Sequence, residues 1–392
     1  MRQHPFRRRR GLASALLVAA LSACGGGSET GAGQPAAATA PPDATTAAGK
    51  ARVAGRRTHA FDRQGITALA VARDGHSVAV ASSDGRVRLM DGSASQELRL
   101  VAGPGKVAVT GLVYSADGRL LVAIGRDSGA QVWDVASGTR RFSLRGHEHA
   151  LRAVAASADG AVVVTGGEET RVMLWDGRSG RLHAVLSGPT DFVDALALSA
   201  DARWLAAGDA SGRLLVWDLA ARPLPAAAPA GTGGHAGANG ALAGASTGAG
   251  LGARWAAPAT TPATTPAASH TGAHTGAIAA LAFAGNTGLL ASAGRDGQVL
   301  LWHVGPAGAH LLHRLTGQRG GVRSLAFNPT ATLLAGAGDD GRLLVWDVAT
   351  RSVRHTVQAS TRAVNVVAFG AGQAVLIAGD AQDRVSAWTL AP

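Results

Sequence analysis

Two groups of side chains in this sequence combine a histidine, a hydroxyl and a carboxylate, and a tryptophan follows each group. They are His274, Ser292, Asp296 and Trp302, and His147, Thr165, Glu169 and Trp175. A histidine that takes the proton of a neighbouring hydroxyl makes that oxygen a nucleophile, so these groups could perform acyl transfer. A packing motif is the interpretation that we favour, because a buried indole N–H, hydroxyl and imidazole must each find a hydrogen-bond partner. The elements that carry these residues decide between the two.

Other arrangements of catalytic or metal-binding residues are scarce. The sequence has no HExxH, CxxC, phosphate-binding loop or GxSxG motif. His147 and His149 could share one face of a strand, but His147 already belongs to a group above. His270 and His274 have a spacing that brings side chains together only on a helix, and their stretch is a Gly/Thr loop. We therefore expect no catalytic residue, no metal and no cofactor, and we expect the protein not to be an enzyme.

Nearly the same nine residues occur twice, as GRLLVWDLA at Gly212–Ala220 and GRLLVWDVA at Gly341–Ala349. The second residue of the Trp-Asp pair, or its degenerate equivalent, marks seven positions along the chain. These are Asp91, Asp134, Asp176, Asp218, His303, Asp347 and Thr389. Successive markers lie 42 to 44 residues apart, except for one step of 85 residues. A period of about 40–45 residues that ends in Trp-Asp is typical of a propeller blade.

Each unit consists of short runs separated by turns. In the first unit the runs are Ile66–Ala72, Ser77–Ala81 and Arg86–Met90, with Asp-Gly turns between them. Alternating runs of this length bounded by Asp-Gly turns predict strands joined by hairpins. No segment after Gly25 shows a sustained helical period. The predicted fold class is therefore all-β.

With these features the chain resembles the WD-repeat (WD40) β-propellers from roughly Arg56 to Pro392. The resemblance implies seven four-stranded antiparallel blades around a central channel. It also implies that a tetrad of His, Ser or Thr, Asp and Trp holds each blade, so the eight residues above are structural. In blade three Glu169 replaces the Asp. Two further blades keep only the last two members, Asp127 with Trp133 in blade two and Asp340 with Trp346 in blade six.

The last repeat ends four residues after its third strand, so its fourth strand must come from elsewhere. Arg56–Phe61 is similar to the fourth-strand segments of other repeats. The resemblance implies that this N-terminal strand completes the last blade and so removes an open sheet edge.

The 85-residue step contains an insertion, predicted at 221–270, that follows the third strand of blade four. Its residues are almost all Ala, Gly, Pro and Thr, with Trp255 as the single aromatic. Such a composition cannot bury enough apolar surface to order itself, which predicts a disordered loop. A decayed eighth blade and a partner-binding loop are the alternatives. The missing fourth strand is then either Gly252–Ala256 or a strand just before His274.

The N-terminus predicts export. Residues 1–23 have an arginine-rich head, a short apolar stretch and small residues before Cys24, as in a secretory signal peptide. Leu21–Cys24 resembles the bacterial lipobox, which implies lipid on Cys24, the only cysteine. Residues 24–55 would form a flexible Gly/Ala/Pro/Thr tether. The alternatives are an ordinary signal peptide, and a twin-arginine signal that the sequence fits only in part.

Charge and location restrict the partners. The formal charge of +11 falls to +6 when the five arginines of residues 1–23 are removed. Export and the absence of a Lys/Arg run from the mature domain argue against nucleic acid. Gly25 is not the Asp that often retains lipoproteins at the inner membrane, so we expect the periplasmic side of the outer membrane. The expected partners are other envelope proteins or peptides, and the propeller itself is expected to be a monomer.

We expect a membrane-anchored, non-catalytic scaffold that binds partners through the propeller's top face. The resemblance to WD40 propellers implies that the top face carries the turns between second and third strands and the loops that enter the first strands. The candidate partner-binding residues there are Gln64, Arg126, His149, Arg152, Glu168, Asp191, Phe192, Asp194, Arg295, Arg319, Arg323, Asp339, Arg362 and Asn365. Phe192 is either an interface anchor or a plug against the neighbouring blade.

An arginine at or near the second turn of each blade could form a ring that attracts acidic partners, or each could pair with a neighbouring Asp. Five of these arginines stand four residues before the Trp position, and the two other blades have theirs seven residues before it. They are Arg86, Arg171, Arg213, Arg342 and Arg384, and Arg126 and Arg295. The alternative function is a small-ligand-binding or enzymatic propeller that uses the central channel. It requires converging polar residues at the inner strand ends, where the first strands are mostly Ala, Leu and Val.

Overall fold

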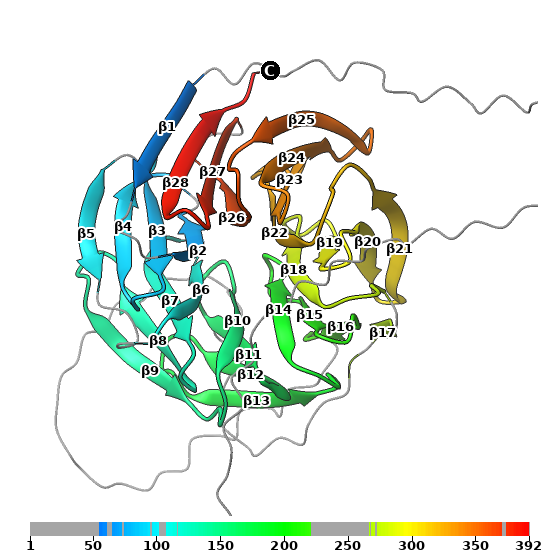
Figure 1. Cartoon of the computed structure of the whole chain (residues 1–392). Coiled ribbons are helices and arrows are strands. Elements are labelled where there is room, and N and C mark those ends of the chain that lie inside the picture. The colour runs from blue at the N-terminus through cyan, green and yellow to red at the C-terminus, as the bar shows by residue number, and fades with distance from the viewer. Residues whose placement is uncertain are drawn as a thin grey trace, which may run out of the picture. The chain divides into compact units, whose positions relative to one another are not determined.

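The computed structural model describes residues 55–60, 65–72, 74–94, 96–101, 107–115, 117–220, 266, 268–270, 273–370 and 374–391. These residues form seven four-stranded antiparallel sheets arranged as a propeller (Figure 1). This confirms the all-β, seven-bladed prediction. In the described part of the chain, no helix is long and apolar enough to cross a membrane.

Apart from the outer strand of blade seven, each blade is built in chain order from the central channel outwards (Figure 1). Blade one consists of β2 (Ile66–Val71), β3 (Ser77–Ser82), β4 (Val87–Asp91) and β5 (Glu97–Val101). Blade two consists of β6 (Val109–Tyr114), β7 (Leu120–Gly125), β8 (Gly129–Asp134) and β9 (Arg140–Arg145). Blade three consists of β10 (Leu151–Ala156), β11 (Val162–Gly167), β12 (Glu169–Asp176) and β13 (Leu182–Ser187). Blade four consists of β14 (Val193–Leu198), β15 (Trp204–Asp209), β16 (Leu214–Asp218) and β17 (Ala268–His270).

The remaining blades follow the same plan. Blade five consists of β18 (Ile278–Phe283), β19 (Leu289–Gly294), β20 (Val299–Gly305) and β21 (Gly308–Leu315). Blade six consists of β22 (Val322–Phe327), β23 (Leu333–Gly338), β24 (Arg342–Asp347) and β25 (Ser352–Gln358). Blade seven consists of β26 (Val364–Phe369), β27 (Val375–Asp380), β28 (Arg384–Thr389) and β1 (Gly55–Ala60).

The hydrophobic core lies between the blades. Each buried apolar cluster combines the facing surfaces of two neighbouring blades, as in the clusters between blades three and four and between five and six. The cluster of Ile66 and Val80 with Ile377 and Val385 joins blade one to blade seven. The first strands β2 and β26 also contact each other across this junction. The blades therefore hold one another in a closed ring, and no blade buries its two apolar faces alone.

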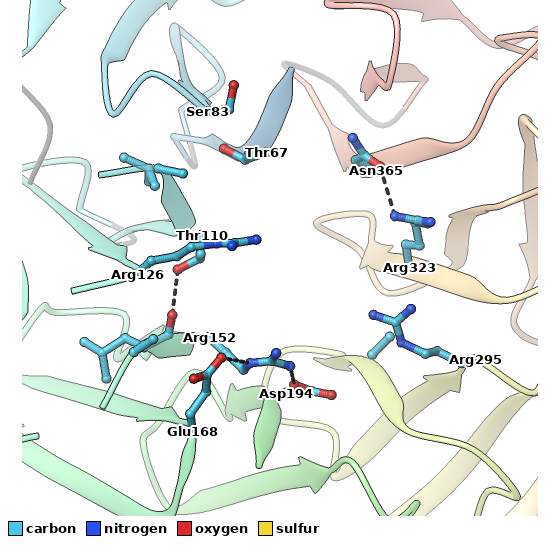
Figure 2. Close-up of a pocket in the computed structure, with 15 residues that line it drawn as sticks. Thr67, Ser83, Thr110, Arg126, Arg152, Glu168, Asp194, Arg295, Arg323 and Asn365 are labelled. Carbon is cyan, nitrogen blue, oxygen red and sulfur yellow. Dashed lines mark hydrogen bonds and ion pairs between the residues drawn. The ribbon is translucent and has the colours of Figure 1, made fainter. Parts of the chain in front are cut away.

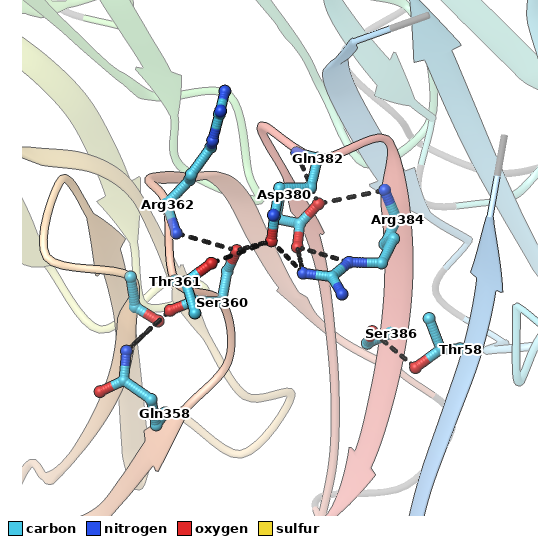
Figure 3. A network of polar contacts seen from close by, with 10 residues as sticks. Thr58, Gln358, Ser360, Thr361, Arg362, Asp380, Gln382, Arg384 and Ser386 are labelled. Carbon is cyan, nitrogen blue, oxygen red and sulfur yellow. Dashed lines mark hydrogen bonds and ion pairs between the residues drawn. The ribbon is translucent and has the colours of Figure 1, made fainter. Parts of the chain in front are cut away.

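The N-terminal strand completes blade seven, as the sequence predicts. β1 pairs antiparallel with β28, from Gly55 opposite Thr389 to Ala60 opposite Arg384. The hydroxyls of Thr58 and Ser386 lie 3.0 Å apart across this pair (Figure 3). The two ends of the propeller sequence thus meet in one sheet, which covers the edge that β28 would otherwise expose.

The fourth strand of blade four is β17, the alternative just before His274. Its residues lie opposite Leu214, Leu215 and Val216 of β16. The Arg213 guanidinium donates a hydrogen bond of 2.8 Å to Ser269 Oγ, which further attaches β17 to the blade. The predicted insertion 221–270 therefore overlaps the blade at its last three residues. Residues 221–265 lie outside the described residues, and so do the predictions of disorder, of a binding loop and of an eighth blade within them.

A steric constraint explains why a glycine precedes the arginine in both copies of the duplicated nine residues. Gly212 and Gly341 lie in the turns between second and third strands with φ of 84° and 73°. A Cβ on Gly212 would lie 2.4 Å from the His274 carbonyl oxygen, and one on Gly341 would lie 2.3 Å from that of Ser360. Only glycine tolerates both the left-handed backbone and this approach. The turn therefore packs directly against the loop that enters the next blade.

Candidate binding site at the channel mouth

The two tetrads are buried hydrogen-bonded chains. In blade five, Trp302 Nε1 donates to Ser292 Oγ over 2.9 Å, and Ser292 Oγ lies 2.8 Å from His274 Nε2. His274 Nδ1 lies 3.0 Å from Asp296 Oδ1. Because an ionised carboxylate only accepts, Nδ1 carries the proton and Nε2 accepts from the serine hydroxyl. Ser292 is completely buried, so its oxygen is a structural link that no substrate can reach.

Blade three has the same chain with different side chains. Trp175 Nε1 donates to Thr165 Oγ1 over 2.7 Å, and His147 Nε2 lies 2.7 Å from the same oxygen. His147 Nδ1 lies 3.1 Å from Glu169 Oε1, which also accepts from the backbone N–H of Glu148 over 2.7 Å. Burial lowers the pKa of His147 more than the Glu169 carboxylate raises it, so the imidazole is neutral near pH 7. Burial likewise lowers the pKa of His274 despite Asp296.

Other blades replace the tetrad. In blade six, Trp346 Nε1 donates to the Thr316 carbonyl over 2.9 Å. In blade seven, Gln382 Oε1 accepts a hydrogen bond of 3.1 Å from Ser360 Oγ (Figure 3). In blade two, Asp127 Oδ1 is buried without a hydrogen bond to any described residue, and burial raises the pKa of this carboxyl group. The hydrogen-bond set thus differs from blade to blade while the propeller stays the same.

A pocket lies at the top of the central channel, with a volume of about 490 Å³ (Figure 2). Each blade contributes the second residue of its first strand. These residues are Thr67, Thr110, Arg152, Asp194, Ala279, Arg323 and Asn365. In all seven blades the strand pairing skips this residue, so it occupies a β-bulge. A bulge re-aims a side chain, and here it turns one residue per blade toward the channel. We call these seven residues the bulge ring.

A second, incomplete ring lies above the bulge ring. Its members are the residues that directly follow the second strands. The backbone N–H of each donates a hydrogen bond to a carbonyl oxygen in the loop that enters the first strand of the same blade. Those that line the pocket are Ser83, Arg126, Glu168 and Arg295. Asp339 holds the equivalent place in blade six. We call these positions the turn ring.

Hydrogen bonds join the bulge ring from blade to blade. Arg152 Nη1 donates to Asp194 Oδ1 over 2.6 Å, and Arg152 Nε donates to Glu168 Oε1 over 3.2 Å. Arg323 repeats this pattern with Asn365 at 3.3 Å and Asp339 at 2.6 Å. In both cases a bulge-ring arginine binds the turn-ring acid of its own blade and the bulge-ring residue of the next blade. These two arginines are held by fixed partners.

Arg126 and Arg295 differ from those two. Both occupy the turn-ring position, where blades three and six carry an acid, and beneath them stand Thr110 and Ala279 in the bulge ring. Neither guanidinium makes a hydrogen bond or ion pair with another residue that the structure describes. In Figure 2 both side chains extend toward the opening from opposite sides of the mouth. They are cations whose position the fold does not explain.

Seven of the fourteen predicted partner-binding residues line this pocket. They are Arg126, Arg152, Glu168, Asp194, Arg295, Arg323 and Asn365. Asp339 binds Arg323 from just outside. His149, Arg319 and Arg362 lie on the entry loops around the mouth, and Asp191 precedes β14. Gln64 and Cys24 lie outside the described residues.

Phe192 is an exposed aromatic beside the pocket. It is 41% exposed, and the Arg152 guanidinium carbon lies 5.2 Å from the centre of its ring. It is therefore not a plug buried against the neighbouring blade. An exposed ring that stacks on an ion-paired arginine provides an amphipathic surface at the edge of the mouth.

The arginines four residues before the Trp position do not line the pocket. Arg342 and Arg384 lie 2.7 and 3.0 Å from Asp340 and Asp380, and Arg86 lies 3.6 Å from Asp84. These three arginines therefore pair with a neighbouring Asp, which is the second of the two predicted alternatives. Arg213 donates instead to the Gly188 carbonyl and to the hydroxyls of Thr190 and Ser269, and Arg171 is exposed outside the pocket. Of the expected ring of arginines, only Arg126 and Arg295 line the pocket.

The first strands are mostly Ala, Leu and Val, which predicted few polar groups in the channel lining, but the lining of the mouth includes several charged side chains. The prediction rested on the whole first strands, whose alternate residues pack between blades. The bulge makes the second residue of each strand an exception, and in four of the seven blades that residue carries a charge or an amide: Arg152, Asp194, Arg323 and Asn365. Aligning that one position across the repeats would have found the polar ring.

Comparison with protein families agrees with the fold. Residues 266–303 and 309–347 match the WD domain, G-beta repeat. The chain therefore carries WD40 repeats within a seven-bladed propeller, a fold typical of protein–protein interaction scaffolds. Residues 73–203 match the Cytochrome D1 heme domain. No curated protein matches the chain.

The pocket does not fit the haem that the second family's name implies. Haem iron in proteins takes an axial His, Cys, Met or Tyr ligand. None of the residues that line the pocket is of these types. His147 and His274 are buried with both ring nitrogens engaged in their tetrads. The similarity over residues 73–203 therefore carries no haem chemistry into this pocket.

Proposed function

We propose that this protein is a non-catalytic interaction module that is anchored by lipid on Cys24 to a membrane of the bacterial cell envelope and binds partner proteins through its top face. One observation carries the binding part. The bulge ring places one side chain from each blade at the mouth of a single pocket, where charged groups from separate repeats converge. Converging, fixed polar groups in a concave site are what recognition requires.

The surroundings of the pocket support protein binding. Interface hot spots are enriched in arginine and aromatic residues, and charged rims steer association. Arg126, Arg295, Arg362 and Phe192 are exposed at or around the mouth. The tetrad hydroxyls are buried, so they contribute to the scaffold alone.

Cross-linking in cells, followed by affinity capture and mass spectrometry, tests this function. Arg126, Arg295, Arg323 and Arg362 are changed together to Glu. The matched control changes Arg140, Arg141, Arg178 and Arg181 to Glu, four exposed arginines that do not line the pocket. We expect a few envelope proteins to be enriched with the parent and with the control, and to be lost from the top-face variant. Equal loss from both variants would contradict top-face binding.

The anchor is tested separately. Cys24→Ser removes the thiol that would carry diacylglycerol, so the protein should leave the membrane fraction and lose labelling by a fatty-acid analogue. Because acyl chains bind membranes by burying CH₂ groups, the parent should be released by detergent but not by salt. Density separation of the two membranes then tests the proposed outer-membrane location. Retention of Cys24→Ser in the membrane fraction would refute the lipid anchor.

A second candidate is a small-ligand-binding propeller that uses the channel. The bulge ring supplies the converging polar residues that this function requires. Native mass spectrometry of the purified protein tests it. A small molecule that co-purifies with the parent, and not with an Arg126→Glu Arg295→Glu variant, would favour this candidate.

A further inference from the structure

Arg126 and Arg295 interrupt the charge pattern of the channel mouth. The turn ring has an acid wherever the bulge ring has an arginine, as with Glu168 above Arg152 and Asp339 above Arg323. In blades two and five the turn-ring residue is instead an arginine, and the bulge-ring residue beneath it, Thr110 or Ala279, is uncharged. Neither the threonine hydroxyl nor the alanine methyl can neutralise a guanidinium.

The fold itself does not need these two positive charges. Both side chains are exposed and lack a described hydrogen-bond or ion-pair partner. By contrast, three of the arginines near other turns lie beside an aspartate of their own turn. An unpaired arginine in a concave site is a ready binder of oxyanions, because its planar fork offers parallel N–H donors.

The two charges lie on opposite sides of the mouth. Arg126 comes from blade two and Arg295 from blade five, and Figure 2 shows both reaching toward the centre with Arg323 near Arg295. Arg152 offers little to an anion, since Glu168 and Asp194 already bind it. A ligand that uses both free arginines must therefore carry two separated anionic groups.

We propose that Arg126 and Arg295 bind two carboxylates of one ligand across the channel mouth, and that this ligand is an acidic peptide segment of the partner. The proposal rests on the proposed function, since it names what the top face recognises. Aspartate and glutamate side chains supply separated carboxylates on a protein partner. A pocket of about 490 Å³ accommodates a few residues of an extended chain rather than a folded domain.

The test uses the purified full chain and fluorescent peptides of alternating glutamate and glycine. The matched peptide has glutamine in place of every glutamate. We expect anisotropy to show binding of the acidic peptide, binding weaker by roughly tenfold or more for the glutamine peptide, and further weakening as salt increases. Arg126→Gln and Arg295→Gln should each weaken binding of the acidic peptide by roughly tenfold, the loss expected when a charged hydrogen bond is removed.

Two control variants separate this site from general attraction. Arg141→Gln changes an exposed arginine that does not line the pocket, and Arg86→Gln changes an exposed arginine at the second turn of blade one, on the same face but outside the pocket. Neither should alter binding by more than about twofold, within the range of rim charges. If Arg86→Gln weakens binding as much as Arg126→Gln does, the attraction is diffuse and the proposal is wrong. Unchanged melting temperatures for all four variants would exclude misfolding as the cause.

Free glutarate distinguishes the two sources of a carboxylate pair. If the ligand is a peptide, glutarate should displace it only weakly. If glutarate binds as tightly as the acidic peptide, and both arginine variants lose it, the peptide part of the proposal is overturned in favour of a free dicarboxylate. If neither probe binds while the top-face variant still loses its captured partners, this inference fails and the proposed function stands.

Discussion

Arg152 Nη1 and Asp194 Oδ1 lie 2.6 Å apart and connect the first strands of two neighbouring blades. Arg323 and Asn365 hold the equivalent positions three blades further on, at 3.3 Å. The same two bulge positions thus serve both to line the pocket and to join blades. Binding at the mouth and the cohesion of the ring therefore share side chains.

Arg152→Met should destabilise the protein by about 1 kcal/mol, measured as the free energy of unfolding in urea. Arg152 is 37% exposed, so its ion pairs contribute only modestly, but the Asp194 side chain, at 12% exposure, loses its partner. A double-mutant cycle with Asp194→Asn isolates the pair. Strict additivity of the two changes would show that the contact contributes nothing.

Ser292→Ala should cost about 1–3 kcal/mol, because it leaves the buried Trp302 indole N–H and His274 Nε2 without a partner. Thr165→Ala should behave alike in blade three. The control is Ser179→Ala, which changes an exposed serine at a turn and should shift stability by less than about 0.5 kcal/mol. Urea unfolding of the three variants measures this. Equal effects at Ser292 and Ser179 would mean that the tetrad is dispensable.

The repeat made the propeller predictable, but it concealed the pocket. Trp302 and Trp346 recur within third strands at a nearly constant period, and the Asp-Gly turns mark the hairpins, so the blades follow from local pattern. Closure by Gly55–Ala60 followed from a missing fourth strand. These features depend on spacing, which a sequence displays directly.

The polar lining of the channel mouth depends on a β-bulge in each first strand, and a β-bulge produces no regular spacing that the sequence would display. Arg152 and Asp194 look like ordinary strand residues, and strict alternation would assign them the same orientation as their neighbours two residues on. The skipped pairing between Leu151 and Ala153 removes Arg152 from that alternation. Arg152 pairs with Glu168 across its own blade and with Asp194 of the next blade, whereas Arg126 lacks such partners among the described residues; these contacts join residues far apart in the sequence. Such contacts become visible only in three dimensions.

Stability should fall as the pH drops below about 6.5, the ordinary histidine pKa. Burial lowers the pKa of both His147 and His274. It outweighs the carboxylates of Glu169 and Asp296, which raise these pKa values. Arg171 lowers the pKa of His147 slightly further, and Arg314 does the same for His274. Below pH 6.5 the unfolded chain therefore binds more protons than the folded chain, and acid favours unfolding. The stabilisation is complete above that pH and is lost as pH falls through the lowered pKa values.

A second loss should follow at lower pH. Burial raises the pKa of Glu169, but backbone N–H donors and His147 lower it by more, and Asp296 behaves in the same way. Stability from these carboxylates is lost as pH falls below their ordinary values of 4.5 and 3.8. Urea unfolding at a series of pH values measures both steps. His274→Gln should flatten the first step, and a first step of unchanged size would remove His274 as a source.

Removal of β1 should destabilise the propeller far more than its six residues suggest. Without Gly55–Ala60, the backbone of β28 loses its partner from Arg384 to Thr389, and Thr58 no longer meets Ser386. Each lost backbone hydrogen bond contributes about 1 kcal/mol, so the total should reach several kcal/mol. The uncovered edge can then pair with a second chain.

A variant that lacks residues 1–60 is compared with one that lacks only 1–54, by urea unfolding and by size-exclusion chromatography at several concentrations. The shorter deletion should match the parent, whereas the longer one should unfold earlier and form dimers or larger species. Coinciding unfolding curves and elution volumes would mean that blade seven is stable with three strands and that closure by β1 is not what holds the ring.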